Sequence, residues 1–202
     1  MNSLDAAFWN ERFSHEHYVY GETPNAFIAE CAAHIPAGPV LCLAEGEGRN
    51  AVYLASLGHR VAAVDQSEVG MAKARRLAAA RGVVIETVVA NLEKYSIAPG
   101  AWVGIVATFA HLPPLLRRRI HGEVVAGLEP GGVFILEAYT PAQLAFGTGG
   151  PKNPELLMTL AALRDELSGL DFLVAHEIER EVIEGGGHTG RAAVVQILAR
   201  RA

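Results

Sequence analysis

Runs of mainly apolar residues alternate with amphipathic segments along most of the chain, beginning at Pro39. Continuous apolar runs of this length are typical of strands that are buried on both faces of a parallel sheet. The expected strands lie at 39–44, 59–65, 83–89, 102–109 and 133–138. Parallel neighbours need crossover connections, so the pattern predicts an α/β fold.

The amphipathic segments between these runs have the spacing of crossover helices. The first two are followed by Gly58 and Gly82, which suit the left-handed residue that often ends a helix. Helices are expected over 49–57, from Ser67 to about Arg81, from Pro113-Pro114 onward and from Asn153-Pro154 onward.

The two ends of the chain differ from this alternation. Residues 172–184 and 191–200 are both strand-like and are joined through three glycines without a helix, which predicts an antiparallel hairpin. Before Pro39, helices are expected over about Leu4 to Phe13 and Thr23 to Ala33. We therefore expect one domain over 1–202, with an N-terminal helical segment (1–38) and a Rossmann-like, doubly wound core (39–202).

Composition and charge narrow the class of protein. The 202 residues are 50% hydrophobic and carry a net charge of -5. The 17 Lys and Arg are scattered along the chain, except for the run Arg117 to Arg119, which is expected to be a solvated helix face. A broad positive field is lacking, which argues against nucleic acid as a partner. No signal peptide and no run of about 20 apolar residues is found, and Cys31 and Cys42 are expected as buried thiols. We expect a cytoplasmic protein without a membrane contact.

The stretch LAEGEGRN (43–50) joins the first expected strand to a helix. Gly46, Gly48 and Ala51 fit the Gly-x-Gly-x-x-Ala pattern, in which glycines allow a sharp turn and a close approach of backbone to a ligand. Asp65 closes the second expected strand, where a carboxylate can accept hydrogen bonds from both hydroxyls of a ribose. The pattern predicts an adenosine-type ligand at the carboxyl ends of the strands.

The acids in this turn help to choose the ligand. Glu45 and Glu47 would oppose the pyrophosphate of a nicotinamide dinucleotide, whereas the cationic sulfonium of S-adenosylmethionine suits them. The chain is also short for a separate substrate domain. An NAD(P)-dependent oxidoreductase and a non-catalytic S-adenosylmethionine-binding protein stay open as alternatives.

The chain resembles the class I S-adenosylmethionine-dependent methyltransferases, and most closely the small bacterial tellurite-resistance and thiopurine enzymes. The resemblance rests on the glycine turn, on AVDQS (63–67) and ANLE (90–93), and on the terminal hairpin. The segments WNERF (9–13) and YGETPN (20–25) resemble the lid of that group. In two places the chain departs from the pattern, because Cys42 replaces a frequent acid and Ala44 replaces the first glycine.

This resemblance implies a seven-stranded, mostly parallel sheet with an antiparallel last strand. It also implies methyl transfer to a small-molecule acceptor, with S-adenosylhomocysteine as the product. Residues 45–48 would wrap the methionine portion of the donor, Asp65 would hold the ribose, and Gln66, Asn91 and Leu92 would meet the adenine. The full expected donor-binding set is Trp9, Arg12, Tyr20, Glu45, Gly46, Glu47, Gly48, Asn50, Asp65, Gln66, Ser67, Asn91, Leu92, Thr108 and Phe109.

Histidines near the expected site have alternative roles. His111 is a candidate general base for the acceptor, or it lines the acceptor site. His188, in the hairpin turn, would either reach the cleft or lie in solvent, and solvent is the favoured alternative. His15 with His17 lacks further ligands for a metal. No metal is expected. The acceptor atom and the choice between monomer and homodimer stay open.

Tyr20 and Arg12 belong to the expected lid. Trp9, Tyr18 and Tyr20 would either cover the sulfonium, where cation–π attraction contributes about 0.5–2 kcal/mol, or pack the N-terminal helix. Arg12 would either pair with the methionine carboxylate of the donor or lie on a solvated helix face.

Overall fold

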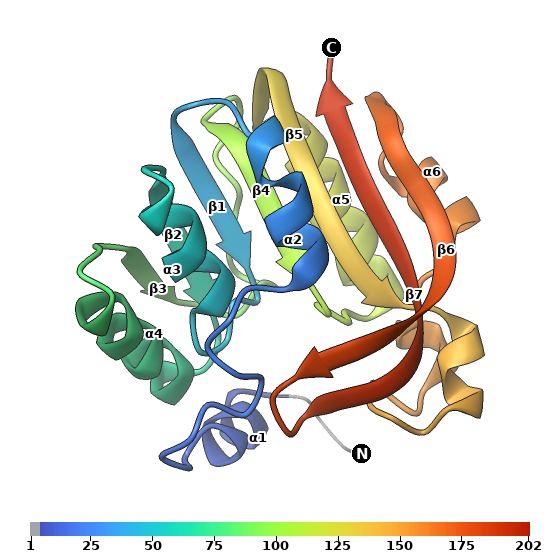
Figure 1. Ribbon diagram of the computed structural model, residues 1–202. Coiled ribbons are helices and arrows are strands. Elements are labelled where there is room, and N and C mark those ends of the chain that lie inside the picture. Colours follow the sequence, from blue (N-terminus) through green and yellow to red (C-terminus); the bar gives the residue numbers. More distant parts are fainter. Residues whose placement is uncertain (1–4) are drawn as a thin grey trace.

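The computed structural model describes residues 5–202 and is built around a seven-stranded sheet with the order β3-β2-β1-β4-β5-β7-β6 (Figure 1). The strands are β1 (Pro39–Leu43), β2 (Arg60–Asp65), β3 (Glu86–Val89), β4 (Trp102–Thr108), β5 (Leu128–Tyr139), β6 (Leu170–Glu184) and β7 (His188–Arg201). Strands β1 to β5 pair in parallel, and β7 pairs antiparallel with both β5 and β6. The expected fold class is confirmed.

The strand order reverses between β1 and β4. Leu43, the last residue of β1, aligns with Val64 of β2 on one side and with Ala107 of β4 on the other. The chain leaves β1 toward β2 but returns to β4 on the opposite side, so the segments after β1 and β4 diverge. Open α/β sheets bind ligands at such a switch point.

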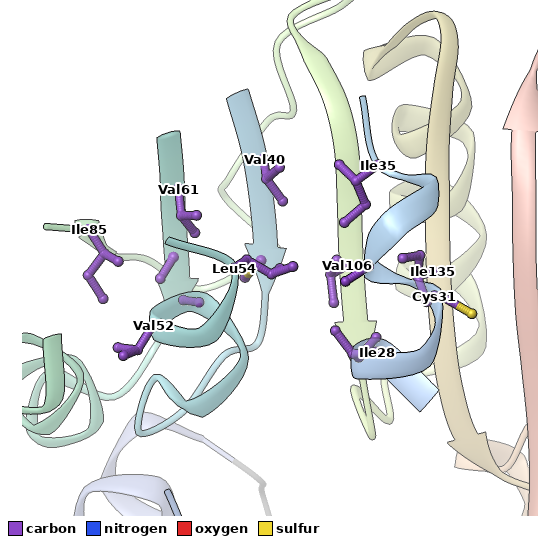
Figure 2. Close-up of a cluster of buried hydrophobic side chains, with 14 of the residues drawn as sticks. Ile28, Cys31, Ile35, Val40, Val52, Leu54, Val61, Ile85, Val106 and Ile135 are labelled. Atoms are coloured by element: carbon purple, nitrogen blue, oxygen red, sulfur yellow. The ribbon is translucent and has the colours of Figure 1, made fainter. Parts of the chain in front are cut away.

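Helices cover both faces of the sheet. One face carries α2 (Ala26–Cys31), α3 (Arg49–Ser56) and α4 (Glu68–Ala80), and the other carries α5 (Pro114–Gly127) and α6 (Leu160–Glu166). Figure 2 shows Ile28 of α2 and Leu54 of α3 lying over side chains of the central strands, among them Val40 and Val106. Helix α1 (Ala6–Arg12) lies at the carboxyl ends of the parallel strands, beside the β6–β7 turn (Figure 1).

Most helix boundaries agree with the sequence patterns. Ser67 caps α4 by accepting a hydrogen bond from the Gly70 N–H at 3.0 Å, as expected. Helix α1 begins at Ala6 after the cap Asp5, while the expected start at Leu4 lies outside the described residues.

The expectation that a helix begins at Asn153-Pro154 was wrong. Asn153 caps only a single 3-10 turn (Pro154–Leu156), and α6 begins at Leu160. Between them Met158 donates its backbone N–H to the Tyr139 carbonyl at 2.9 Å. The chain must therefore run extended along the end of β5 before it can turn into a helix.

The expectation that Arg117 to Arg119 form a solvated helix face was wrong for Arg117. Its side chain is buried, with Nη2 2.9 Å from a carboxylate oxygen of Glu166, and that carboxylate also meets His121 Nδ1 at 2.7 Å. Arg118, by contrast, is exposed. Only part of the run 117–119 is therefore a solvated face.

Two further expectations concern cysteines and membrane spans. Cys31 and Cys42 are free and buried in the core, as expected. Within residues 5–202, no helix combines the length and the apolar character needed to cross a membrane.

Candidate functional site

Two residues with left-handed backbone mark the carboxyl ends of the central strands. Ala44, after β1, has φ 49°, and Phe109, after β4, has φ 52°. They are the only residues other than glycine with positive φ in the described chain. The left-handed region costs an L-residue about 1–2 kcal/mol, and such strain gathers at functional sites. The two positions flank the switch point of the sheet.

Glu45 occupies the N-terminus of α3. Its Oε1 accepts hydrogen bonds from the backbone N–H groups of Asn50 at 2.9 Å and Ala51 at 2.7 Å. In a dinucleotide-binding turn, such N–H groups receive a phosphate. Because the chain supplies its own carboxylate there, the turn suits a donor without a phosphate.

The Glu45 carboxyl is enclosed, and burial raises its pKa to about 7. A cation placed beside it would favour the ionised form of this carboxyl. The sulfonium and the ammonium of S-adenosylmethionine are two such cations. The residues present therefore fit this donor.

Asp65 ties the end of β2 to the glycine turn. Its Oδ2 accepts the N–H of Gly46 at 2.9 Å, and its Oδ1 accepts the N–H of Ser67 at 2.8 Å. Each ionised carboxylate oxygen can accept a further hydrogen bond. Ser67 in turn donates its hydroxyl to Asn10 Oδ1 of α1 at 2.7 Å, which brings the N-terminal helix to this end of the sheet.

Glu47 faces the N-terminal segment. Its Oε2 accepts the N–H of Val19 at 2.8 Å and lies 3.4 Å from the N of Tyr20, and its Oε1 forms a buried ion pair with Lys73 of α4. The structure thus places this carboxylate on residues 19–20, although the sequence suggested the methionine portion of the donor. Its contacts fix the segment over the glycine turn.

Asn50 joins three elements at the same end of the sheet. Its Nδ2 donates to Thr108 Oγ1 of β4 at 2.9 Å, and its Oδ1 accepts the N–H of Asn25, the cap of α2, at 2.9 Å. Thr108 is half-buried. Asn50 therefore positions the carboxyl end of β4 relative to the glycine turn.

The residues expected around adenine lie beyond Asp65. The Ala90 N–H donates to the Asp65 carbonyl at 2.9 Å, so Asn91 and Leu92 follow directly beside the end of β2. Leu92 is buried and Asn91 is exposed, with its Oδ1 accepting from the Glu93 N–H at 2.8 Å. Gln66 is half-buried next to Asp65.

Aromatic rings from four segments meet beyond Phe109. The ring centroid of His188 lies 4.5 Å from that of Tyr20, 4.6 Å from that of Phe109 and 5.3 Å from that of Tyr139. Phe109 and Tyr139 lie 4.6 Å apart. We refer to Tyr20, Phe109, Tyr139 and His188 as the aromatic cluster.

Two polar atoms of this cluster are buried without a hydrogen-bond partner among the described residues, namely Tyr139 Oη and His188 Nδ1. Buried polar atoms without a partner are uncommon and often mark a functional site. Of the two alternatives for His188, the favoured one, a position in solvent, was wrong, since only 8% of the residue is exposed. The hairpin turn folds over the N-terminal segment, where the Gly187 N–H donates to the Val19 carbonyl at 3.1 Å.

His111 lies beside the cluster with both ring nitrogens near backbone atoms. Its Nδ1 is 2.9 Å from the Leu156 carbonyl, and the Tyr139 N–H lies 3.5 Å from its Nε2. Burial lowers the pKa of this imidazole to about 4. The donor to the carbonyl is Nδ1–H, which leaves the Nε2 lone pair directed at a backbone amide.

Trp9 and Arg12 of α1 contact their own segment. The Trp9 ring stacks on Phe13 at 5.4 Å, and Arg12 Nε donates to Tyr20 Oη at 2.8 Å. The guanidinium of Arg12 also lies 5.4 Å from the centre of the Tyr20 ring. These contacts orient Tyr20, so Arg12 reaches the site through that ring.

Sequence reasoning missed a buried polar network behind the cluster. Arg49 Nη2 pairs with Glu184 Oε2 at 2.6 Å, and Asn25 Nδ2 donates to Glu184 Oε1 at 2.7 Å. Arg180 pairs with Glu137 at 2.6 Å. These partners are far apart in the chain, so no local pattern signalled them. Among residues 5–202, no group of three or more His, Cys, Asp or Glu is arranged to hold a metal ion.

Comparison with known proteins agrees with this geometry. Residues 40–132 match the family model described as a methyltransferase domain, which spans the glycine turn, Asp65 and the end of β4. A search of curated proteins found no match.

Several solved structures share the fold. A structure described as "Conversion of a Disulfide Bond into a Thioacetal Group during Echinomycin Biosynthesis" has a TM-score of 0.76 and 20% identity, over 98% of this chain and 89% of that chain. TehB from Haemophilus influenzae has a TM-score of 0.73 and 20% identity, over 98% and 67%. The N-methyltransferase NodS from Bradyrhizobium japonicum WM9 has a TM-score of 0.67 and 13% identity, over 98% of both chains.

The fold, the glycine turn and the family match together define a class I S-adenosylmethionine-dependent methyltransferase domain. The protein is an S-adenosylmethionine-dependent methyltransferase, and S-adenosylmethionine is its methyl donor. The resemblance drawn from the sequence is confirmed.

Proposed function

We propose that this enzyme transfers the methyl group to a small-molecule acceptor held at the aromatic cluster. The observation that carries the proposal is the burial of His188 within this cluster, where its ring contacts rings from the N-terminal segment, from the end of β4 and from β5. Enclosed sites with mainly apolar walls and a few polar atoms are typical of small ligands. A polymer would need a wide, open surface.

The proposed donor site runs along the ends of β1, β2 and β4. Asp65 would accept hydrogen bonds from the ribose, and Leu92 with Gln66 would flank the adenine. Glu45 would lie near the cationic end, where its buried carboxylate stabilises positive charge. When bound, the donor supplies a methyl carbon on a cationic sulfur, which makes a neutral thioether the leaving group.

The N-terminal segment, residues 5–38, is proposed as the lid of this site. The buried pair of Glu47 and Lys73 holds its middle part, and Ser67 holds α1 through Asn10. The contact between Gly187 and Val19 joins this lid to the hairpin turn. Water excluded by these contacts strengthens electrostatic interactions within the site.

A groove beside the cluster offers a route for the acceptor. It has a volume of about 510 Å³ and is lined in part by Arg12, Val19 and Gly187. Arg12 donates to Tyr20, and a side chain at Gly187 would collide with the Tyr20 ring. The groove is therefore close to Tyr20, whose ring belongs to the cluster.

Two of the solved structures with a similar fold support a small-molecule acceptor. NodS is named as an N-methyltransferase, and the structure with the thioacetal concerns the biosynthesis of echinomycin. His111, expected as a base or a lining residue, is proposed as a lining residue, because its ring nitrogens are directed at the backbone of Leu156 and Tyr139.

The proposal is tested by supplying S-adenosylmethionine with a radiolabelled methyl group and a cell extract separated by size. We expect label in the fraction of small molecules, and none with Asp65→Ala in place of the wild type. Label in protein or nucleic acid, with none in the small-molecule fraction, would contradict the proposal.

A further inference from the structure

His188 combines burial with a carboxylate partner at the end of the hairpin. Its Nδ1 lies 3.7 Å from Glu184 Oε2, four residues earlier, and makes no hydrogen bond within the described chain. The ring contacts Phe109, which directly follows the end of β4. A histidine that is oriented by a carboxylate and faces a reactive site is the arrangement found in general-base catalysis.

Glu184 is well suited to orient this imidazole. Although burial opposes ionisation, the contacts with His188 and Arg49 hold the pKa of Glu184 at about 2, so it is a carboxylate at neutral pH. A carboxylate attracts Nδ1–H rather than the Nδ1 lone pair. The proton of neutral His188 therefore resides on Nδ1, and Nε2 keeps its lone pair.

His111 differs from His188 in the surroundings of its Nε2 atom. Its Nδ1 also carries the proton, but its Nε2 lone pair is directed at the Tyr139 backbone N–H, 3.5 Å away. His188 Nε2 has no hydrogen bond with any described residue, so its lone pair is free to accept a proton.

We propose that His188 is the catalytic base of the methyl transfer, that Glu184 positions it, and that the acceptor is a flat, apolar molecule whose nucleophilic atom carries a proton at neutral pH. This inference rests on the proposed function. Aromatic walls favour a flat partner, and a base is needed only where the acceptor is not already ionised.

The reaction moves one proton and one methyl group. His188 Nε2 takes the proton of the acceptor, and the freed electron pair forms a bond to the methyl carbon. The bond between that carbon and sulfur breaks, and its electrons stay on sulfur as S-adenosylhomocysteine. The imidazolium then returns its proton to solvent.

Several groups act on the charge of His188 from different elements. Glu184 favours the imidazolium, while burial and the positive charges of Arg49 and Arg12 oppose it, so that the pKa of His188 falls below its usual value. A base with a lowered pKa is neutral and ready at pH 7. The titratable groups nearby are Arg12, Tyr20, Arg49, His111, Tyr139 and Glu184.

The first test needs no acceptor. Protein labelled with 15N-histidine is titrated by NMR with S-adenosylhomocysteine bound, and the His188 signals are assigned by their loss in His188→Gln. We expect neutral His188 at pH 7 with its proton on Nδ1. A proton on Nε2, or a charged imidazole at pH 7, would overturn the proposal.

The second test compares two flat acceptors, phenol, which is protonated at neutral pH, and thiophenol, which is largely ionised. General-base catalysis contributes about 10²–10⁴-fold, so His188→Gln should lower kcat/KM for phenol at least about 100-fold and for thiophenol less than about 10-fold. The matched control is His176→Gln, on the same hairpin, whose imidazole meets Gln196 instead of the site. This control should keep both rates.

Equal losses for the two acceptors, or no loss for phenol, would overturn the role of His188. A failure of the proposed function is distinguishable. In that case the label from S-adenosylmethionine would appear in protein or nucleic acid and not in small molecules, and the NMR titration would still decide the protonation of His188.

Discussion

The buried ion pair of Lys73 and Glu47 should be a main support of the N-terminal segment. Only 1% of the Lys73 side chain and 3% of the Glu47 side chain are exposed. Lys73 Nζ also donates to the carbonyls of His17 at 2.7 Å and His15 at 2.9 Å, and it lies 4.8 Å from the Tyr18 ring centre. One ammonium therefore gathers the backbone of residues 15–18 onto α4.

Lys73→Met removes this charge and keeps most of the side-chain volume. The buried Glu47 carboxylate then loses its cationic partner, and the carbonyls of His15 and His17 lose a hydrogen-bond donor. Breaking a buried pair from one side costs about 3–5 kcal/mol, because an uncompensated charge is left behind. We expect a loss of this size in the free energy of unfolding, together with weaker binding of S-adenosylhomocysteine.

Urea unfolding followed by circular dichroism measures the loss. The matched control is Arg81→Met, which breaks the pair of Arg81 and Glu22, whose side chains are 55% and 48% exposed. Exposed pairs contribute about 0–1 kcal/mol, so the control should change little. If Lys73→Met cost less than about 1 kcal/mol, the pair would not be the support described above. Glu47→Gln keeps an acceptor for the Val19 N–H and should cost less than Lys73→Met.

Three further predictions concern the glycine turn and its surroundings. Asp65→Ala should abolish measurable binding of S-adenosylhomocysteine in calorimetry, since it removes the proposed ribose acceptor and the partner of the Gly46 N–H; unchanged affinity would show that the donor lies elsewhere. Ala44→Gly should relieve the strain of the left-handed backbone at this position, about 1–2 kcal/mol. The greater chain entropy of glycine in the unfolded state offsets about 0.5–1 kcal/mol of this gain, so the melting temperature should stay the same or rise. A clear fall in the melting temperature would contradict the strain. Burial raises the pKa of Glu45 from 4.5 to about 7, so the donor-free protein should lose stability, relative to Glu45→Gln, as the pH rises from about 4.5 to 7. Melting curves of the two proteins across this range check the sign, and parallel curves would show that Glu45 is not protonated.

The sequence was sufficient for most of the fold. Apolar runs without alternation identified the five parallel strands, and three glycines without a following helix identified the terminal hairpin. The missing helix at Asn153-Pro154 shows the limit of local signals. A good cap and a proline were present, but the backbone contact of Met158 with Tyr139 decided the conformation.

The site could be predicted where its residues are close in the chain. The glycine turn and Asp65 follow from one strand–turn–helix pattern, and both lie at the switch point. The surroundings of His188 could not be predicted, because its contacts come from residues 20, 109 and 139, and the glycines beside it read equally well as an exposed turn. The same holds for Glu47, whose partner Lys73 lies in another helix.

The central claim is that the glycine turn binds S-adenosylmethionine and leaves no place for a phosphate. Calorimetric titration of the purified protein with S-adenosylhomocysteine and, separately, with NADH tests it most directly. The position of the Glu45 carboxylate on the Asn50 and Ala51 N–H groups predicts binding of S-adenosylhomocysteine and none of NADH. Binding of NADH without binding of S-adenosylhomocysteine would contradict it.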